Sequence, residues 1–277
     1  TVFGSVIPLT MIVFEDINDG CRIIPPYQSD GFPHKDDPDG HYLFLGKRES
    51  IIEPMMYKYT DEKKGKDEFR ELISPFLKSK MIKAERELGK DSSDYIALEK
   101  QYIINNSEKN IEANLEKPRH YQSGVNGYYD NKPLVGLERL YKKTILIEPT
   151  TVCAAHCRWC VRGQYPVQTM SKDNIVNATK YIGSDERANE LDEVLITGGD
   201  PLMSISLLEF TLKEIQKNAK NIKIIRIASR VPFHDPERIN DKMLEVFTKF
   251  KKFRFELGTH VNHPVEFWPE SVESIKR

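Results

Sequence analysis

The stretch TILIEPTTVCAAHCRWC, residues 144–160, joins a short apolar run to a loop that carries three cysteines. A short apolar run that ends in a polar loop predicts a buried β-strand. The cysteines follow at Cys153, Cys157 and Cys160, directly after the predicted strand. This stretch therefore predicts a strand whose carboxyl end presents a group of thiols.

The residues after position 140 repeat this arrangement, with helices between the strands. Further apolar runs predict strands at 192–199, 221–229 and 253–260. Amphipathic stretches predict helices at 172–182, 206–219 and 236–250. Strands and helices that alternate in this way form a parallel sheet with right-handed crossovers. We therefore expect an α/β fold, either doubly wound or curled into a barrel.

Each predicted strand is followed by an unusual cluster of polar or small residues. In chain order the four clusters read CAAHCRWC, GGDP, SRVP and THVNHP. The carboxyl ends of parallel strands lie on one face, where the active sites of such folds are built, so the clusters should converge. A cluster of polar or small residues after all four predicted strands favours an enzyme over a purely structural domain.

The cysteine loop has two readings. Three thiolates can ligate three irons of a [4Fe–4S] cube and leave the fourth iron open to a small molecule. The alternative is a non-catalytic scaffold that binds zinc, with His156 or Cys21 as a fourth ligand. Structural zinc ligands usually come as two separated pairs, and His156 lies between the thiols, so the spacing favours the cluster.

The composition limits the other classes of function. The chain of 277 residues has a formal net charge of −1, which gives no general positive field for nucleic acid or anionic membranes. Its longest apolar run, at residues 1–14, is shorter than the roughly 20 residues that span a bilayer. Clustered cysteines do not suit a disulfide framework. We expect no nucleic-acid partner, no membrane and a reducing cytoplasm.

The first 140 residues differ in texture and predict a separate, mainly helical region, 1–140, before an incomplete barrel at 141–277. Polar helical stretches lie at 67–88 and 93–117, and Pro75 should break or kink the first. Both ends of the chain look cut. Four strands alone would leave two open sheet edges, so we expect the isolated chain to aggregate or to be inactive.

Four motifs after residue 140 resemble those of a known family. They are CRWCVR at 157–162, LITGGDPL at 195–202, IRIASRVP at 225–232 and THVNHPVEF at 259–267. Together with the cysteine spacing they are similar to the radical S-adenosylmethionine (SAM) enzymes, and within these to the lysine 2,3-aminomutase family. The resemblance implies a partial parallel (β/α) barrel of radical SAM type, truncated at its carboxyl end, with a [4Fe–4S] cluster on the three cysteines.

The resemblance also implies roles for the second and third clusters. Gly198 and Gly199 would let the backbone approach the methionyl amine of S-adenosylmethionine, and Asp200 would add a negative charge beside it. Ser229 and Arg230 would grip the ribose or the carboxylate of the same cofactor. In a plainer reading the glycines form only a strand-to-helix turn.

Further residues are assigned by position in the motifs. Trp159 would face the adenine, and His260, Asn262 and His263 would lie across the barrel mouth. Arg162 is the candidate for the substrate carboxylate. In the plainer reading Trp159 is a core residue and the histidines cap or hydrogen-bond.

The aminomutases also use pyridoxal phosphate, so the resemblance implies this cofactor, an amino acid substrate and 1,2-amino migration. The imine lysine of the family lies beyond the end of this chain. Arg139, Lys142 and Lys143 lie where relatives contact the phosphate, although the register does not match. An electron donor such as flavodoxin or ferredoxin and a homo-oligomer are also implied. An enzyme that modifies a lysyl group on a protein is the alternative.

Overall fold

The structure is a computed structural model. It describes residues 70–105, 128–139, 141–160 and 169–277, together with the backbone of three strands nearer the N-terminus. These strands are β1 (Thr10–Ile17), β2 (Gly20–Ile24) and β3 (Met55–Met56). In the part of the chain that is described, no helix is long and apolar enough to cross a membrane.

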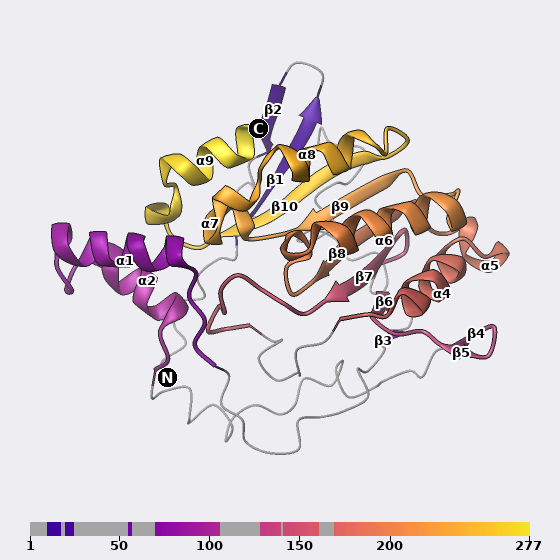
Figure 1. Ribbon diagram of the computed structural model, residues 1–277, viewed down its shortest axis with the longest axis horizontal. Helices are drawn as coiled ribbons and strands as arrows, with labels where there is room; N and C mark the ends of the chain where they lie inside the picture. The colour runs from indigo at the N-terminus through magenta and orange to yellow at the C-terminus, as the bar shows by residue number, and fades with distance from the viewer. Residues whose placement is uncertain are drawn as a thin grey trace.

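The centre of the fold is a set of four adjacent parallel strands (Figure 1). They are β7 (Thr144–Thr150), β8 (Glu193–Gly198), β9 (Ile224–Ala228) and β10 (Arg254–Val261). Each lies within the residues predicted from the apolar runs or within three residues of them. The predicted parallel α/β sheet is confirmed.

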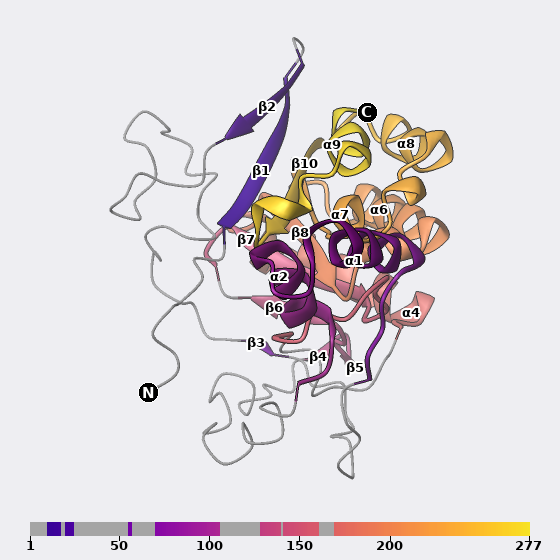
Figure 2. The ribbon, with the colours of Figure 1, turned by 90° about the vertical axis from the view of Figure 1, so that its left-hand side faces the viewer.

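Three helices follow these strands and lie on one side of the sheet (Figure 2). They are α4 (Lys172–Ile182), α6 (Ile205–Asn218) and α8 (Asp241–Thr248). Each begins at a side chain that accepts a hydrogen bond from a backbone N–H in the first turn: Ser171, Ser204 and Asn240. Their apolar faces pack with alternate strand residues such as Val194, Ile196 and Ile225 into the main core.

The opposite face of the sheet carries charge. Arg226 lies in the middle of it and is almost fully buried. Its Nη1 lies 3.0 Å from Glu193 Oε1 on β8 and its Nη2 lies 2.7 Å from Glu256 Oε2 on β10. Arg254 also pairs with Glu256. Because buried charges need partners, these residues hold the three strands together across this face.

The sheet continues beyond the parallel strands on both sides, in the order β2-β1-β10-β9-β8-β7-β6-β3. Strand β1 runs antiparallel to β10, from Thr10 opposite Val261 to Glu15 opposite Glu256. Strand β6 (Leu137–Arg139) runs antiparallel to β7. The expectation of two open edges is therefore wrong, because residues before position 140 add strands to the same sheet.

A helical hairpin lies against the carboxyl ends of the parallel strands. It consists of α1 (Pro75–Leu88) and α2 (Ser93–Tyr102). Pro75 begins α1 instead of kinking a longer helix, because proline fits the first helical turn, where its missing N–H costs no hydrogen bond. The second helix ends at Tyr102, before an extended Ile103, and is thus shorter than predicted.

The hairpin packs through a small core of its own. Leu77, Leu98 and Tyr102 are fully buried in it, together with Ala155 of the cysteine loop. The remaining elements are short: β4 (Tyr128–Tyr129), β5 (Lys132–Pro133), α5 (Asp185–Ala188), α7 (Val231–His234) and α9 (Pro269–Lys276).

Candidate functional site

The cysteine loop leaves the carboxyl end of β7 and turns back over β8. Cys153, Cys157 and Cys160 each carry a thiol that is partly exposed. A tight turn within the loop is closed by the Cys160 N–H, which donates to the Cys157 carbonyl oxygen at 2.9 Å. The Asp200 N–H, beyond β8, donates to the Val152 carbonyl oxygen at 2.8 Å. The thiols are thus held on a loop that is fixed to the neighbouring strand.

The same loop is fixed from the other side by the hairpin and by the segment that precedes α1. The His156 N–H donates to the Leu72 carbonyl oxygen at 2.8 Å, and the Arg158 N–H donates to the Gln101 carbonyl oxygen at 2.9 Å. The ring Nδ1 of His156 lies 2.8 Å from the Arg70 carbonyl oxygen. The contacts of the hairpin with the loop could not be read from the sequence.

The two glycines after β8 allow this close approach of the loop. A Cβ on Gly198 would lie 2.6 Å from the Thr150 carbonyl oxygen, and its φ of +112° already disfavours other residues. A Cβ on Gly199 would lie 2.3 Å from the Thr151 carbonyl carbon and 2.5 Å from the Val152 oxygen. The space beside both glycines is filled by the backbone of the cysteine loop, which gives a reason for glycine at both positions.

Asp200 connects the end of β8 to the end of β9. Its carboxylate accepts from Ser229 Oγ at 2.8 Å and from the N–H groups of Arg230 at 2.8 Å and Val231 at 3.1 Å. It also accepts from the Leu202 N–H at 3.1 Å. Burial raises the pKa of Asp200 to about 6, although all four hydrogen bonds act against that rise. Asp200 and Ser229, two of the predicted site residues, therefore hydrogen-bond to each other, and Asp200 also accepts from backbone N–H groups.

Arg230 reaches from the end of β9 toward the cysteine loop. Its Nη1 donates to Cys157 Sγ at 3.2 Å. Its Nη2 pairs with Glu266 and lies 3.4 Å from Gln101 Oε1. Burial works against the charge, but Tyr102, Cys157 and Glu266 outweigh it and raise the pKa of Arg230 above its ordinary value. The guanidinium is therefore a fixed positive charge beside a thiol.

Glu266 balances this charge from the segment after β10. Its side chain is 0% exposed. Besides pairing with Arg230, it accepts from Tyr102 Oη at 3.2 Å, from the Asn262 N–H at 2.6 Å and from the His263 N–H at 3.1 Å. The sequence analysis missed Glu266 and Tyr102, although Glu266 lies in the quoted motif THVNHPVEF. A charged residue at an apolar-flanked position was the signal that could have found it.

Two further predicted residues, Trp159 and His260, lie in the same region. Trp159 is 46% exposed, so it is not a core residue, and its ring centre lies 5.9 Å from Arg230 Cζ. His260, on β10, lies near the same guanidinium. Burial, followed by the charge of Arg230, lowers the pKa of His260. His263 caps the short turn at 264–266, as the plainer reading expected. Arg162 lies outside the described residues.

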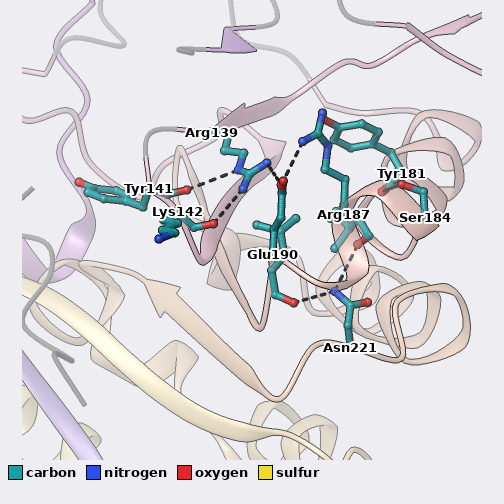
Figure 3. A network of polar contacts seen from close by, with 10 residues as sticks. Arg139, Tyr141, Lys142, Tyr181, Ser184, Arg187, Glu190 and Asn221 are labelled. Carbon is teal, nitrogen blue, oxygen red and sulfur yellow. Dashed lines mark hydrogen bonds and ion pairs between the residues drawn. The ribbon is translucent and has the colours of Figure 1, made fainter. Parts of the chain in front are cut away.

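The basic residues before β7 lie at the other end of the sheet. Arg139 is buried and pairs with Glu190 at 2.6 Å, as Figure 3 shows. It also donates to the Lys142 carbonyl oxygen at 2.8 Å. Glu190 precedes β8, so this network lies at the amino ends of the strands, opposite the cysteine loop. Arg139 therefore has a structural role and does not face the candidate site.

The donor set of the loop fits an iron–sulfur cluster. Three thiols extend from one short loop. Burial, followed by Asp200 and the other two cysteines, raises the pKa of Cys153, which disfavours the thiolate while no cation is bound. A thiol of this kind loses its proton when a metal cation binds it. Among the described residues, no group of three or more His, Cys, Asp or Glu side chains is placed to hold a single metal ion. A cube instead spreads its three thiolates over separate irons.

The profile of the Radical SAM superfamily matches residues 147–275, which begin in β7 and include the cysteine loop and the ends of β8, β9 and β10. The chain carries a radical SAM domain. Its four parallel strands are the part of a radical SAM barrel that this chain contains.

Curated proteins similar to this radical SAM chain are aminomutases. The L-lysine 2,3-aminomutase of Methanococcus maripaludis is 32% identical over 224 residues, which are 79% of this chain and 47% of that protein. A putative L-lysine 2,3-aminomutase of Aquifex aeolicus is 35% identical over 51% of this chain and 38% of its own length. The glutamate 2,3-aminomutase of Clostridioides difficile is 31% identical over 51% and 33%. The chain spans about half or less of these relatives.

Proposed function

We propose that this chain is the cluster-binding part of a radical SAM aminomutase. The observation that carries the proposal is the convergence of three thiols and the ends of β8, β9 and β10 on one site within a radical SAM domain. Cys153, Cys157 and Cys160 would each ligate one iron of a [4Fe–4S] cluster. When bound, such a cluster supplies the electron that cleaves S-adenosylmethionine to methionine and a 5′-deoxyadenosyl radical.

The protein would bind and orient S-adenosylmethionine beside the loop. Trp159 offers an exposed aromatic face for the adenine. His260 lies near Arg230. Gly198, Gly199 and Asp200 would hold the loop, and with it the cysteines that ligate the cluster, against the end of β8. Ser229 would act through its hydrogen bond to Asp200.

An amino acid is the proposed substrate, and Arg162 is the proposed partner of its carboxylate. The support is the similarity to proteins named for lysine and glutamate 2,3-aminomutation and the position of Arg162, two residues after Cys160. Pyridoxal phosphate would supply the imine that holds the migrating amine. A flavodoxin or ferredoxin as electron donor, a homo-oligomer and a cytoplasmic location complete the proposal.

The test is anaerobic reconstitution followed by electron paramagnetic resonance (EPR) of the reduced protein with and without S-adenosylmethionine. We expect a [4Fe–4S]⁺ signal that changes when the cofactor is added. The variant Cys157→Ser should lose the signal, and Cys21→Ser, which alters the cysteine outside the loop, should keep it. Zinc in place of iron, or a signal indifferent to the cofactor, would overturn the proposal.

Substrate choice is a separate measurement on the reconstituted full-length protein. Lysine and glutamate are supplied in turn, and their 3-amino isomers are separated by chromatography. Formation of either isomer supports aminomutation of a free amino acid. If neither forms while the cofactor is cleaved, modification of a lysyl group on a protein becomes the better hypothesis.

A further inference from the structure

The surroundings of Arg230 differ from those of a residue that waits for a ligand. Its side chain is only 10% exposed. Its two terminal nitrogens already have acceptors in Cys157 Sγ, Gln101 Oε1 and Glu266. Its Nε is buried and has no hydrogen-bond partner among the described residues, so it is the one donor of the guanidinium left for a cofactor carboxylate. Nη1 is directed at a proposed cluster ligand.

The guanidinium is held in this position by two other parts of the chain. Glu266, after β10, is fixed by three further donors. Gln101, on α2, presents its Oε1 both to Arg230 and to Asn262 Nδ2, which lies 3.0 Å away. The ring of Tyr102, also on α2, lies 5.9 Å from Arg230 Cζ. The hairpin therefore takes part in placing the charge beside Cys157.

A positive donor at a cluster thiolate has a defined physical effect. Reduction adds one negative charge to the cluster, and part of that charge lies on the sulfurs. A charge-assisted hydrogen bond to one sulfur stabilises the reduced form more than the oxidised form. The cluster then accepts its electron at a higher potential.

We propose that Arg230 is a positioning residue that raises the reduction potential of the cluster through its hydrogen bond to Cys157 Sγ, and that Gln101 of α2 holds it there. This inference rests on the proposed function, because it requires the cluster. It assigns the α1–α2 hairpin a role in the redox chemistry of the site.

The experiment compares redox titrations of the reconstituted protein without S-adenosylmethionine, followed by EPR. Arg230→Lys keeps the charge opposite Glu266 and loses the two-pronged geometry. Gln101→Leu removes the acceptor on α2. Arg226→Lys is the matched control, since Arg226 is a buried arginine within β9 whose ion-pair partners, Glu193 and Glu256, lie on the neighbouring strands β8 and β10. Iron content and thermal unfolding are measured for each variant.

We expect the reduction potential of the cluster in Arg230→Lys to be about 59 mV more negative than in the wild type. This shift is a tenfold decrease in the equilibrium constant for one-electron reduction. Gln101→Leu should shift the potential in the same direction by a smaller amount, and Arg226→Lys should not shift it. If Arg230→Lys fails to hold a cluster, the shift in Gln101→Leu decides.

The failures of the two proposals look different. If the wild-type protein forms no cluster, the proposed function fails and this inference with it. If the cluster forms and both variants keep the wild-type potential, the inference alone is wrong. In that case weaker binding of S-adenosylmethionine to Arg230→Lys would return Arg230 to the role of a cofactor ligand.

Discussion

At the scale of single residues, the chemistry of the site depends on charges fixed by burial. The sequence pattern was enough to find the cysteines, Asp200 and Arg230, because they follow predicted strand ends. It did not predict that Asp200 accepts from four donors of the chain, or that Tyr102 and Gln101 reach the site from a distant helix. Contacts between distant segments have no local signal in one sequence.

His234 is a buried residue whose charge state can be tested. Its ring is packed edge-on against Tyr102 at 5.5 Å, and its Nε2 has no hydrogen-bond partner among the described residues. Burial, followed by the charge of Arg230, lowers the pKa of His234 well below its ordinary value. The folded protein therefore keeps this ring neutral where the unfolded chain binds a proton.

Replacing His234 should change how stability depends on pH. Because the unfolded chain binds a proton at His234 below its pKa of about 6.5 and the folded protein does not, the free energy of unfolding is highest above that pH. Below it, the free energy of unfolding falls by about 1.4 kcal/mol per pH unit. Between pH 7 and pH 5 the free energy of unfolding of His234→Phe should fall by roughly 2 kcal/mol less than that of the wild type, as measured by denaturant unfolding. Phe233→Leu, a buried neighbour that does not titrate, should keep the wild-type slope. Equal slopes for His234→Phe and the wild type would contradict this assignment.

At the scale of elements, local signals located the helices well. Serine caps begin α4 and α6 within one residue of the predicted positions. Helix α8 begins at Asp241, after the Asn240 cap, and not at 236 as predicted, because Pro236–Arg238 form a separate short 3-10 turn. The predicted break at Pro75 is confirmed, because residues 70–74 are not helical and α1 begins at Pro75; the alternative of a kink within one longer helix is wrong. The glycines after β8 were predicted to matter, but the close packing of the cysteine loop on that strand end is seen only in the structure.

The approach of the loop to β8 gives a prediction for Gly199→Ala. The new methyl carbon would lie 2.3 Å from the Thr151 carbonyl carbon, so the backbone of the cysteine loop has to move. We expect a lower iron-to-protein ratio after reconstitution and a lower melting temperature. Gly89→Ala is the control, because Gly89 has φ +85° but open space around its Cα, and it should cost about 1–2 kcal/mol without loss of iron. Full iron binding by Gly199→Ala would refute the packing argument.

At the scale of the whole molecule, the alternation of strands and helices predicted the parallel sheet and the convergence of its strand ends. The additional edge strands were not predicted. Residues 1–14 were noticed as an apolar run. Within it only Thr10–Phe14 lie in the described strand β1, and their pairing with β10 depends on residues far along the chain. Antiparallel pairing across such a separation leaves no periodic signal that differs from any other apolar stretch.

Removal of the edge should test the importance of β1 and β2. Deleting residues 1–24 would expose the backbone donors and acceptors of β10, which now pair with β1. Exposed strand edges associate with other chains, so we expect larger species in sedimentation velocity. Deleting only residues 1–9, which leaves both strands in place, should give the wild-type distribution. The wild-type distribution after the longer deletion would show that the edge is protected in another way.

The pairing of β1 with β10 also has a consequence for synthesis on the ribosome. Strand β1 (Thr10–Ile17) is made before its partner strand, Arg254–Val261, and more than 200 residues of the chain lie between the two. At a translation rate of about 5–20 residues per second, the early strands wait on the order of ten seconds or more for that partner. During this interval the nascent chain presents an unpaired apolar ribbon, which is the kind of surface that holdase chaperones recognise.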